Sequence, residues 1–420
     1  MTAEGNRAVR GSRLFYGWVV VAVSAVAVLV TAGVRVAPGA FLLDMKADTG
    51  WSLGILSLAA AVGLVVYGLT GPVSGALISR FGLRGVTVAS LVITAVAMGA
   101  SSLVTEAWQL ALLFGLLSGV GTGLIASVLA AAVANRWFVR HRGLVVGILS
   151  ASSSAGQLLF FPALTLLATL AGWRLASIAI AGICLVVAVP ILLWLRNTPE
   201  DVGLRPLGAA ADAAPQPTRA DPGIMRRAIR SGNFWLLAGT FFVCGATSNG
   251  LVGQHFIAHA ADHGFAPVVA SGALAIMGAF NFVGTLVSGW LTDRVDPRRL
   301  LLVYYVFRGL SLLYLPAISN NLDITAFAVL FGLDYIATVP PTVALAADTF
   351  GRRNVGIVYG WIFAAHMIGA AVAAFGAGFM RDLIGDYGLS IVIAGWLAIA
   401  AGIVTMSIRR LPAATAAATT

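Results

Sequence analysis

The chain has 420 residues, of which 59% are hydrophobic and 10% are charged, with a formal net charge of +10. Soluble domains carry about 25% charged residues, so this composition excludes an ordinary soluble enzyme. A basic chain can bind nucleic acid through clustered cations, but the positions of the cations, given below, argue against a nucleic-acid partner.

Long uncharged stretches dominate the sequence. A bilayer core about 30 Å thick is crossed by roughly 20 helical residues. Ten runs of at least 21 residues contain no Asp, Glu, Lys or Arg: 14–34, 49–79, 85–105, 107–135, 143–173, 175–195, 231–261, 263–292, 354–380 and 387–408. Two further apolar stretches, around 300–318 and 324–347, contain one charged residue each. The sequence therefore predicts an all-α membrane protein with twelve transmembrane helices.

The cations are distributed unevenly between the loops that join these helices. If both termini are cytoplasmic, 21 of the 26 Lys and Arg residues fall in the termini and loops on the cytoplasmic side. This bias is the positive-inside signal of membrane proteins. It predicts cytoplasmic termini in a multi-pass protein of a bacterial-type cytoplasmic membrane. The lipid bilayer then accounts for the basic charge, and we expect no nucleic-acid partner.

A polar, proline-rich segment divides the chain after the sixth helix. Residues 199–232 have the composition of a linker and contain a short basic element, Met225–Arg230, that we expect at the membrane surface. The predicted organisation is an N-terminal six-helix bundle (1–198), a cytoplasmic linker (199–232), a C-terminal six-helix bundle (233–412) and a disordered tail (413–420).

The two halves carry related loops. The segments Gly75–Arg84 and Gly289–Arg298 follow the second and eighth helices at an offset of 214 residues. The loops after the fourth and tenth helices repeat at nearly the same offset, because Gly143 and Gly356 are 213 residues apart. Tandem halves of this kind place a substrate site at their interface, near the membrane midplane.

The first pair of loops resembles the signature Gly-x-x-x-Asp-Arg-x-Gly-x-Arg of the major facilitator superfamily. The resemblance implies the major facilitator fold and a gating function for these loops. The second loop keeps the aspartate as Asp293, whereas Ser79 occupies that place in the first, so we expect an asymmetric latch. The implied gating residues are Gly75, Arg80, Arg84, Gly289, Asp293, Arg294 and Arg298.

Two segments resemble the monocarboxylate transporters and the oxalate/formate antiporters within that superfamily. Tyr16–Val21 is similar to the opening motif of the monocarboxylate family, and Asn135–Gly156 to its second signature. The family has an Asp and an Arg one turn apart in the eighth helix. Asn281 and Thr285 stand at those positions, so the arginine that would bind a carboxylate has to be sought elsewhere.

Charges inside the membrane are costly and usually functional. Arg35 lies in the first helix, where a guanidinium can hold a carboxylate; the alternatives are a buried pair with Asp44 or snorkelling outward. Arg308 and Asp334, on neighbouring helices nine and ten, are expected to form an ion pair, to couple transport to protons, or both. His366 is a candidate proton relay or a satisfied core histidine.

Polar residues in other helices complete the candidate site. With Arg35, the expected substrate-binding residues are Gln157, Asn249, His255, Asn281 and Tyr335. For each of these, packing without a substrate contact is the alternative. Pro340 and Pro341 lack amide hydrogens and must break or kink the tenth helix.

No cofactor or metal is expected. Cys184 and Cys244 lie singly in apolar runs, and His255 and His259 share one helix face without further ligands nearby. There is no Gly-x-x-x-x-Gly-Lys-Ser/Thr phosphate loop, so the expected driving force is an ion gradient and the protein is not expected to be an enzyme.

We therefore predict a secondary active transporter of a small organic anion, monocarboxylate-like and proton-coupled, that alternates access between two halves and works as a monomer. The alternatives are proton-driven efflux of a hydrophobic or drug-like compound and a non-transporting membrane sensor. Efflux members usually carry a Gly-Pro motif in the fifth helix, where this chain has Phe161 before Pro162.

Overall fold

The computed structural model describes residues 15–125, 127–139, 141–208, 221, 223–292, 294–351 and 354–409, without the side chains of Pro72, Ser79, Ser127 and Arg142. Within these residues the fold is all-helical, apart from one isolated bridge between Phe138 and Leu207. Twelve helical segments are long and apolar enough to cross a membrane, which confirms the twelve predicted spans. The expected tail 413–420 lies outside the described residues.

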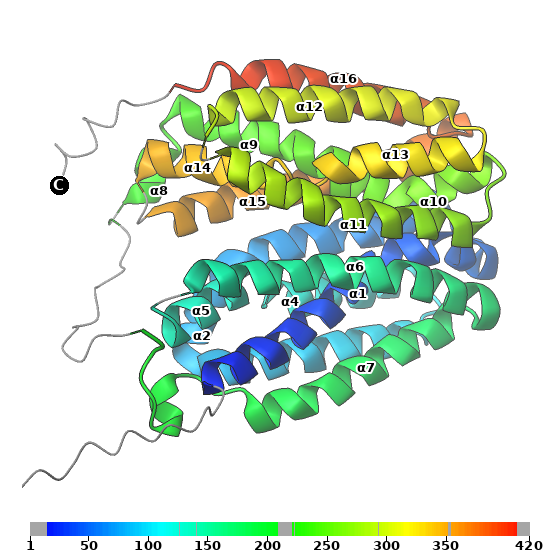
Figure 1. Ribbon diagram of the computed structural model, residues 1–420. Helices are drawn as coiled ribbons and strands as arrows, with labels where there is room; N and C mark the ends of the chain where they lie inside the picture. The colour runs from blue at the N-terminus through cyan, green and yellow to red at the C-terminus, as the bar shows by residue number, and fades with distance from the viewer. Residues whose placement is uncertain are drawn as a thin grey trace, which may run out of the picture.

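The N-terminal half forms one bundle of helices, the lower layer in Figure 1. Its elements are α1 (Tyr16–Thr49), α2 (Leu53–Ser101), α3 (Ala107–Leu110), the π-helix η1 (Ala111–Leu117), α4 (Ser118–Gly123), α5 (Ser127–Trp137), α6 (Arg142–Ala171) and α7 (Trp173–Trp194). The described parts of the linker contain η2 (Pro199–Val202) and α8 (Ile224–Ala228).

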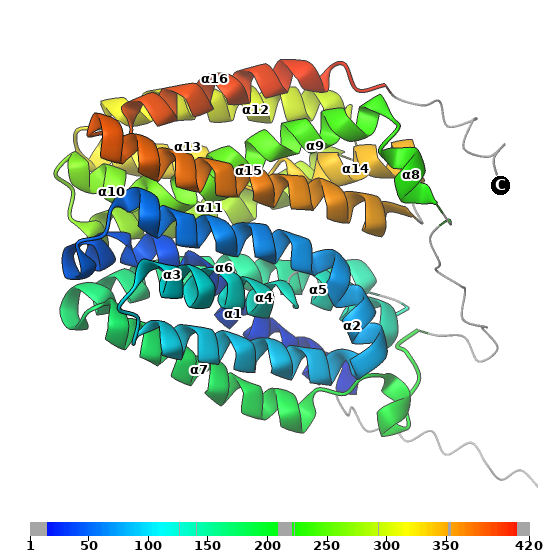
Figure 2. The ribbon, with the colours of Figure 1, turned by 180° about the vertical axis from the view of Figure 1, so that it is seen from behind.

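The C-terminal half forms the second bundle, the upper layer in Figures 1 and 2. Its elements are α9 (Gly232–Gly245), the π-helix η3 (Ala246–Val252), α10 (Gly253–Asp262), α11 (Pro267–Thr292), α12 (Pro297–Tyr314), η4 (Leu315–Ala317), α13 (Asn321–Asp334), α14 (Val339–Phe350), α15 (Val355–Ile384) and α16 (Gly388–Thr405). Between the halves, α2 packs along α15 and α6 along α11.

The second and third spans are joined without an extended loop, which differs from the separation expected from the sequence. Helix α2 runs through both spans and changes direction at Gly82, whose φ of 79° is unusual for any residue but glycine. A Cβ at this position would also lie 2.5 Å from Oδ1 of Asn197. The glycine therefore acts as a hinge between two apolar segments.

The tenth span is broken, as its prolines predict. Helix α13 ends at Asp334, and α14 begins at Val339 with Pro340 and Pro341 in its first turn. Proline is tolerated in the first turn of a helix because its missing amide hydrogen has no intrahelical acceptor there. The break therefore precedes the prolines and exposes backbone groups near Asp334 and Tyr335.

The hydrophobic clusters show where the two halves meet. We call the end of the bundles that carries α8 and the described chain ends the linker end, and the opposite end the distal end (Figure 1). At the distal end, one cluster joins Val30 to Met45 of α1 with Leu251 to Ala260 of η3 and α10. At the linker end, the buried clusters of the described residues each stay within one half. Buried apolar side chains therefore join the two halves at the distal end.

Candidate functional site

Arg35 lies on α1 at the boundary between the halves. Its Nη1 donates to the Tyr67 hydroxyl at 2.6 Å and its Nη2 to Ser153 Oγ at 3.0 Å. The guanidinium carbon also lies 5.0 Å from the centre of the Tyr67 ring. Among the described residues no carboxylate forms an ion pair with Arg35, so the alternative pairing with Asp44 is wrong. In the described part of the chain, the cation is therefore held by two hydroxyl groups and the face of an aromatic ring.

A cavity surrounds this cation, and we call it the Arg35 cavity. Its walls include Arg35, Tyr67, Phe114, Ser118, Thr122 and Gln254. All but Gln254 belong to the N-terminal half, and Gln254 comes from α10. The cavity therefore bridges the two halves, as expected for the substrate site of a tandem-repeat transporter.

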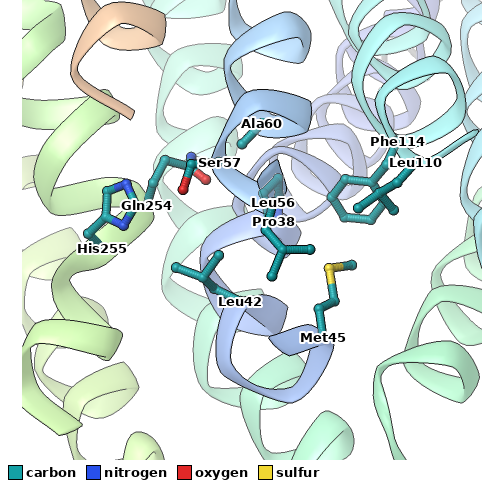
Figure 3. A pocket seen from close by; sticks show the side chains of 10 residues that line it. All are labelled: Pro38, Leu42, Met45, Leu56, Ser57, Ala60, Leu110, Phe114, Gln254 and His255. Atoms are coloured by element: carbon teal, nitrogen blue, oxygen red, sulfur yellow. The ribbon is translucent and has the colours of Figure 1, made fainter. Parts of the chain in front are cut away.

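A second pocket neighbours the Arg35 cavity and shares Pro38, Ala60, Phe114 and Gln254 with it; we call it the distal pocket, and Figure 3 shows its lining. Its walls include Leu42, Met45, Leu56, Ser57, Phe114 and Gln254. His255 also lines it, but both ring nitrogens are already bonded: Nε2 donates to the Ala374 carbonyl at 2.7 Å, and Nδ1 lies 3.3 Å from the Tyr387 hydroxyl.

The Ala374 carbonyl determines which ring nitrogen of His255 accepts. A carbonyl only accepts, so Nε2 carries the proton and Nδ1 accepts from the Tyr387 hydroxyl. The structure thus places His255 at a cavity wall, with its polar atoms bonded to protein.

A third pocket lies between α6 and α11 and is lined by three of the expected binding residues. Its walls include Ser154, Gln157, Phe161, Met277, Asn281 and Tyr335. Asn281 Oδ1 accepts from the Ile336 amide at 3.1 Å and from Thr285 Oγ1 at 3.2 Å. Asn281 therefore caps the backbone exposed by the break in the tenth span, and it also faces the pocket.

The C-terminal half contributes a chain of hydrogen-bonded polar groups. The Tyr335 hydroxyl donates to Asn249 Oδ1 at 3.2 Å, and Asn249 Nδ2 lies 3.1 Å from His366 Nε2. The other ring nitrogen of His366 lies 3.1 Å from the Phe241 carbonyl, which fixes it as a donor and Nε2 as the acceptor. Asn249 lies in the π-helix η3, a type of irregularity common at functional sites.

The two charges of the ninth and tenth spans form a fully buried ion pair. Arg308 Nε lies 2.6 Å from Asp334 Oδ2, and both side chains are 0% exposed. Arg308 Nη2 also donates to the carbonyls of Asp334 (2.7 Å) and Tyr335 (3.1 Å) at the helix break, and Nη1 lies 2.9 Å from Cys244 Sγ. Asp334 Oδ1 has no hydrogen-bond partner among the described residues. The pair thus stabilises the broken helix and leaves one carboxylate oxygen unpaired.

The expected gating loops lie at the linker end, and the hydrogen bonds that Arg84, Arg294 and Arg298 form with other described residues stay within one half each. The described members are Gly75, Arg80, Arg84, Gly289, Arg294 and Arg298; Asp293 lies outside the described residues. Arg298 pairs with Asp296 at 2.7 Å, and the Arg84 amide donates to Asn197 at 3.0 Å. Their part in a latch between the halves stays a prediction.

The distal end is closed by a contact that the sequence did not reveal. Asp382, at the end of α15, accepts from the amides of Leu53 (3.1 Å) and Gly54 (2.6 Å) in the first turn of α2. A carboxylate at a helix N-terminus satisfies free amides and is favoured by the helix dipole. Nearby, a Cβ on Gly39 of α1 would lie 2.5 Å from the Gly253 carbonyl, so the halves also meet there backbone to backbone.

Comparison with known sequences gives consistent matches over most of the chain. The sequence profile of the Major Facilitator Superfamily matches residues 23–374 and 256–419. Monocarboxylate transporter 13 of Bos taurus is 28% identical, with 90% of this chain and 86% of the relative covered. The uncharacterized MFS-type transporter YcxA of Bacillus subtilis is 25% identical (84% and 85% covered), and the MFS-type transporter hasB of Aspergillus fumigatus is 30% identical (75% and 71%).

Solved structures give the same fold. A bacterial homolog of the human lysosomal transporter Spinster, in an inward-facing and occupied conformation, superimposes with a TM-score of 0.72. The alignment covers 96% of this chain and 100% of that chain at 15% identity. At this identity the likeness concerns the fold alone.

Proposed function

Because the chain belongs to the Major Facilitator Superfamily, whose members are membrane transporters and not enzymes, we propose that it carries a small organic anion of the monocarboxylate type. The observation that supports this most directly is Arg35, a cation that has no carboxylate partner among the described residues and that lines a cavity between the halves. An intramembrane arginine is costly unless it has a functional role, and its planar fork suits a carboxylate. The name of the bovine relative, a monocarboxylate transporter, supports the same substrate class.

We further propose that transport is coupled to protons through Asp334. A proton on Oδ1, which has no partner among the described residues, would neutralise the carboxylate and weaken its attraction for Arg308. Arg308 would then be a buried charge without a full counterion, which is strongly destabilising. Tyr335 follows Asp334 directly and bonds to Asn249, which bonds to His366. A change in the pair would thus reach the polar groups that face the substrate.

The proposed cycle is alternating access between the two bundles. We place the linker end on the cytoplasmic side, on the basis of the positive-inside bias, so that the closed distal end faces outward. Movement of one bundle against the other would close the linker end and open the distal end around a fixed midplane site.

The test is transport by the purified protein in liposomes. Labelled lactate, pyruvate, formate and oxalate are offered under an imposed pH gradient, with the wild type compared with Arg35→Ala. We expect uptake of at least one acid by the wild type and its loss in the variant. Arg174→Ala, which removes an arginine at the distal rim, is the matched control and should transport normally.

Two results would overturn the proposal. Uptake of none of these acids by the wild type, together with uptake of a hydrophobic cation, would favour efflux instead. Equal uptake by wild type and Arg35→Ala would show that Arg35 does not bind the anion. Proton coupling has a separate readout: if Asp334→Asn still accumulates the acid against its gradient, Asp334 is structural only.

A further inference from the structure

The thiol of Cys244 in α9 lies against the buried ion pair of the C-terminal half, and the proposed proton step does not use it. We infer that Cys244 is the alternative counterion of Arg308: when a proton binds Asp334, the thiol gives up its own proton and the guanidinium pairs with the resulting thiolate. The inference rests on the proposed proton coupling and deepens it, because it assigns a second acid to the same site.

Arg308 divides its hydrogen bonds between two acidic groups. Its Nε donates to Asp334 Oδ2 at 2.6 Å, and its Nη1 lies 2.9 Å from Cys244 Sγ. Sulfur is larger than oxygen, yet this second distance is typical of a hydrogen bond between nitrogen and oxygen. Charge-assisted hydrogen bonds are the short ones, and a neighbouring arginine favours the thiolate form of a cysteine. The guanidinium is therefore already placed to pair with either group.

The hydroxyl group of Thr338 suits both protonation states of the thiol. Its Oγ1 lies 3.1 Å from Cys244 Sγ, and either atom can be the donor. A hydroxyl group both donates and accepts, so Thr338 can accept from the thiol and donate to the thiolate. Both side chains are buried, so this exchange of roles takes place within the protein.

A proton on Asp334 creates the need for this second counterion. Oδ1 of Asp334 has no hydrogen-bond partner among the described residues, and the residue is 1% exposed, so Oδ1 is the atom that can receive the proton. The neutral carboxyl group no longer balances the buried charge of Arg308, which is strongly destabilising. A thiolate at Cys244 restores the balance. Two acids that interact through one cation lose and gain protons as a unit.

The proton released by the thiol has an acceptor in His366. This residue of α15 lies against the thiol, and a Cβ on Gly245, next to Cys244, would lie 3.0 Å from its Cγ. The ring has one nitrogen without hydrogen, because Nδ1 donates to the Phe241 carbonyl. In the step, an O–H bond forms at Asp334 Oδ1, the S–H bond of Cys244 breaks and an N–H bond forms on the imidazole. Arg308 keeps all its hydrogens.

This step carries the added positive charge toward the substrate side of the C-terminal half. Nε2 of His366 lies 3.1 Å from Asn249 Nδ2, and Asn249 Oδ1 accepts from the Tyr335 hydroxyl at 3.2 Å. A protonated Nε2 can bond to Asn249 only if the amide turns its oxygen toward the ring. That turn breaks the bond from Tyr335, so the proton on Asp334 changes the polar groups beside the substrate.

The remaining titratable side chains that face the pair and the thiol are tyrosines. They come from α12, the helix break and α15: Tyr304, Tyr305, Tyr335 and Tyr359. A phenol is neutral near pH 7, so none of them supplies an anion to Arg308. Among the described residues that contact the guanidinium, Cys244 is therefore the group besides Asp334 that can become its counterion.

Infrared spectroscopy of the protein in liposomes tests the inference on the thiol itself. The S–H stretching band lies apart from the other bands of a protein, and the chain has two cysteines, so Cys184→Ser leaves Cys244 as the single thiol. In this variant we expect the band to weaken as the pH falls and Asp334 takes up its proton. An ordinary thiol gains intensity on acidification, and such a gain, or a constant band, would overturn the inference.

Asp334→Asn in the same background imitates the protonated carboxyl group. The S–H band of Cys244 should be absent at neutral pH, because Arg308 then has the thiolate as its partner. A band of full intensity in this variant would contradict the inference. The titration of the variant that keeps Asp334 decides the question if Asp334→Asn does not fold.

Transport separates coupling from a structural role of the thiol. With a gradient of about one pH unit, coupling of one proton to one acid accumulates the acid about tenfold. Cys244→Ser keeps a hydrogen-bonding group that does not ionise near neutral pH, so its accumulation should fall toward onefold. Exchange of labelled for unlabelled acid needs no net proton movement and should continue at the wild-type rate.

Cys184→Ser is the matched control, because Cys184 is equally buried but lies in α7 of the other half. It should keep both accumulation and exchange. Wild-type accumulation by Cys244→Ser, or equal loss of accumulation and exchange, would overturn the inference and leave coupling through Asp334 in place. If the wild type accumulates no acid, the proposed function fails, and the infrared titration still decides whether Cys244 is the second acid.

Discussion

Removal of the Asp382 carboxylate should shift the protein toward the state that is open at the distal end. The two hydrogen bonds from Asp382 to the amides of Leu53 and Gly54 join α15 of one half to α2 of the other. They exist only while the distal end is closed. Asp382→Ala therefore destabilises the closed state and leaves the opposite state, in which this contact is absent, unchanged.

The size of the effect follows from the geometry. A hydrogen bond to a charged group contributes about 1.5–3 kcal/mol, and a carboxylate at a helix N-terminus gains roughly 0.3–1 kcal/mol from the dipole. Asp382 is exposed at the rim, so solvent screens both contributions, and we take about 2 kcal/mol for the whole contact. Because about 1.4 kcal/mol corresponds to a factor of ten, the equilibrium should move about thirtyfold.

Distances between spin labels in liposomes measure this shift. One pair, at Leu103 and Leu322, spans the distal end, and a second pair, at Phe81 and Val295, spans the linker end; all four side chains are exposed. In Asp382→Ala the distal distance should lengthen and the linker-end distance should shorten. The two changes must occur together, because a local distortion of the rim would move the first pair only.

Asp386→Ala is the matched control for this shift. It removes a carboxylate from the same rim, but Asp386 Oδ1 accepts from the Gly388 amide within the C-terminal half. Its distance distributions should equal those of the wild type. A distribution for Asp382→Ala that is indistinguishable from that of Asp386→Ala would refute the role of the contact in closing the distal end.

Three further changes follow from the contacts of single residues. Arg308→Leu leaves Asp334 as an uncompensated buried charge and should lower the free energy of unfolding by about 3–5 kcal/mol, whereas leucine at both positions should cost less; thermal unfolding in detergent measures both. Gly284→Ala would press a Cβ against the Leu333 carbonyl and should destabilise the protein by about 1–3 kcal/mol, the usual range for overpacking, in the same assay. Arg35→Lys keeps the charge but loses the planar fork, so the concentration of acid that gives half-maximal uptake should rise.

Each of these changes has a result that contradicts its reasoning. If the double leucine variant is less stable than Arg308→Leu, the remaining carboxylate is not the cause of the loss. Gly272→Ala, in the same helix α11 with open space around its Cβ, should be neutral or slightly stabilising, because alanine favours a helix more than glycine does; an equal loss there would mean that the contact with the Leu333 carbonyl is not the cause. Unchanged half-saturation in Arg35→Lys would mean that charge alone holds the anion.

The spans were predictable because the membrane imposes a simple rule on the chain. Uncharged runs identified ten helices, and the two charges in the remaining stretches, Arg308 and Asp334, were costly enough to require partners in the protein. The direct connection at Gly82 was not predictable, since a run of small residues with basic neighbours is as typical of a loop as of a hinge. The φ of 79° at Gly82 and the closeness of Asn197, which leaves no space for a Cβ there, can be seen only in the folded structure.

The site was predictable only in its charges. Arg35 stood out as a lone cation, but its partner Tyr67 lies in an apolar run and Ser153 in a stretch of small residues, where nothing distinguishes either from packing. Asp382 is one of several carboxylates near the ends of the spans. Its oxygens accept from backbone amides, which every residue except proline carries. Contacts made by the backbone leave no trace in composition or spacing.

The charges of the two halves differ in a way that bears on coupling. In the C-terminal half, Arg308 and Asp334 neutralise each other at 2.6 Å, whereas Arg35 in the N-terminal half has no counterion among the described residues. The empty site therefore carries one net positive charge. Under the proposed function, an anion alone brings this charge to zero, and an anion with a proton on Asp334 restores it to one. Because charge at membrane depth is costly, the bound anion lowers this cost and a proton on Asp334 raises it again. The net charge of the site therefore accounts for binding of the anion, and proton coupling under the proposed function has to rest on the change that protonation makes in the pair of Arg308 and Asp334.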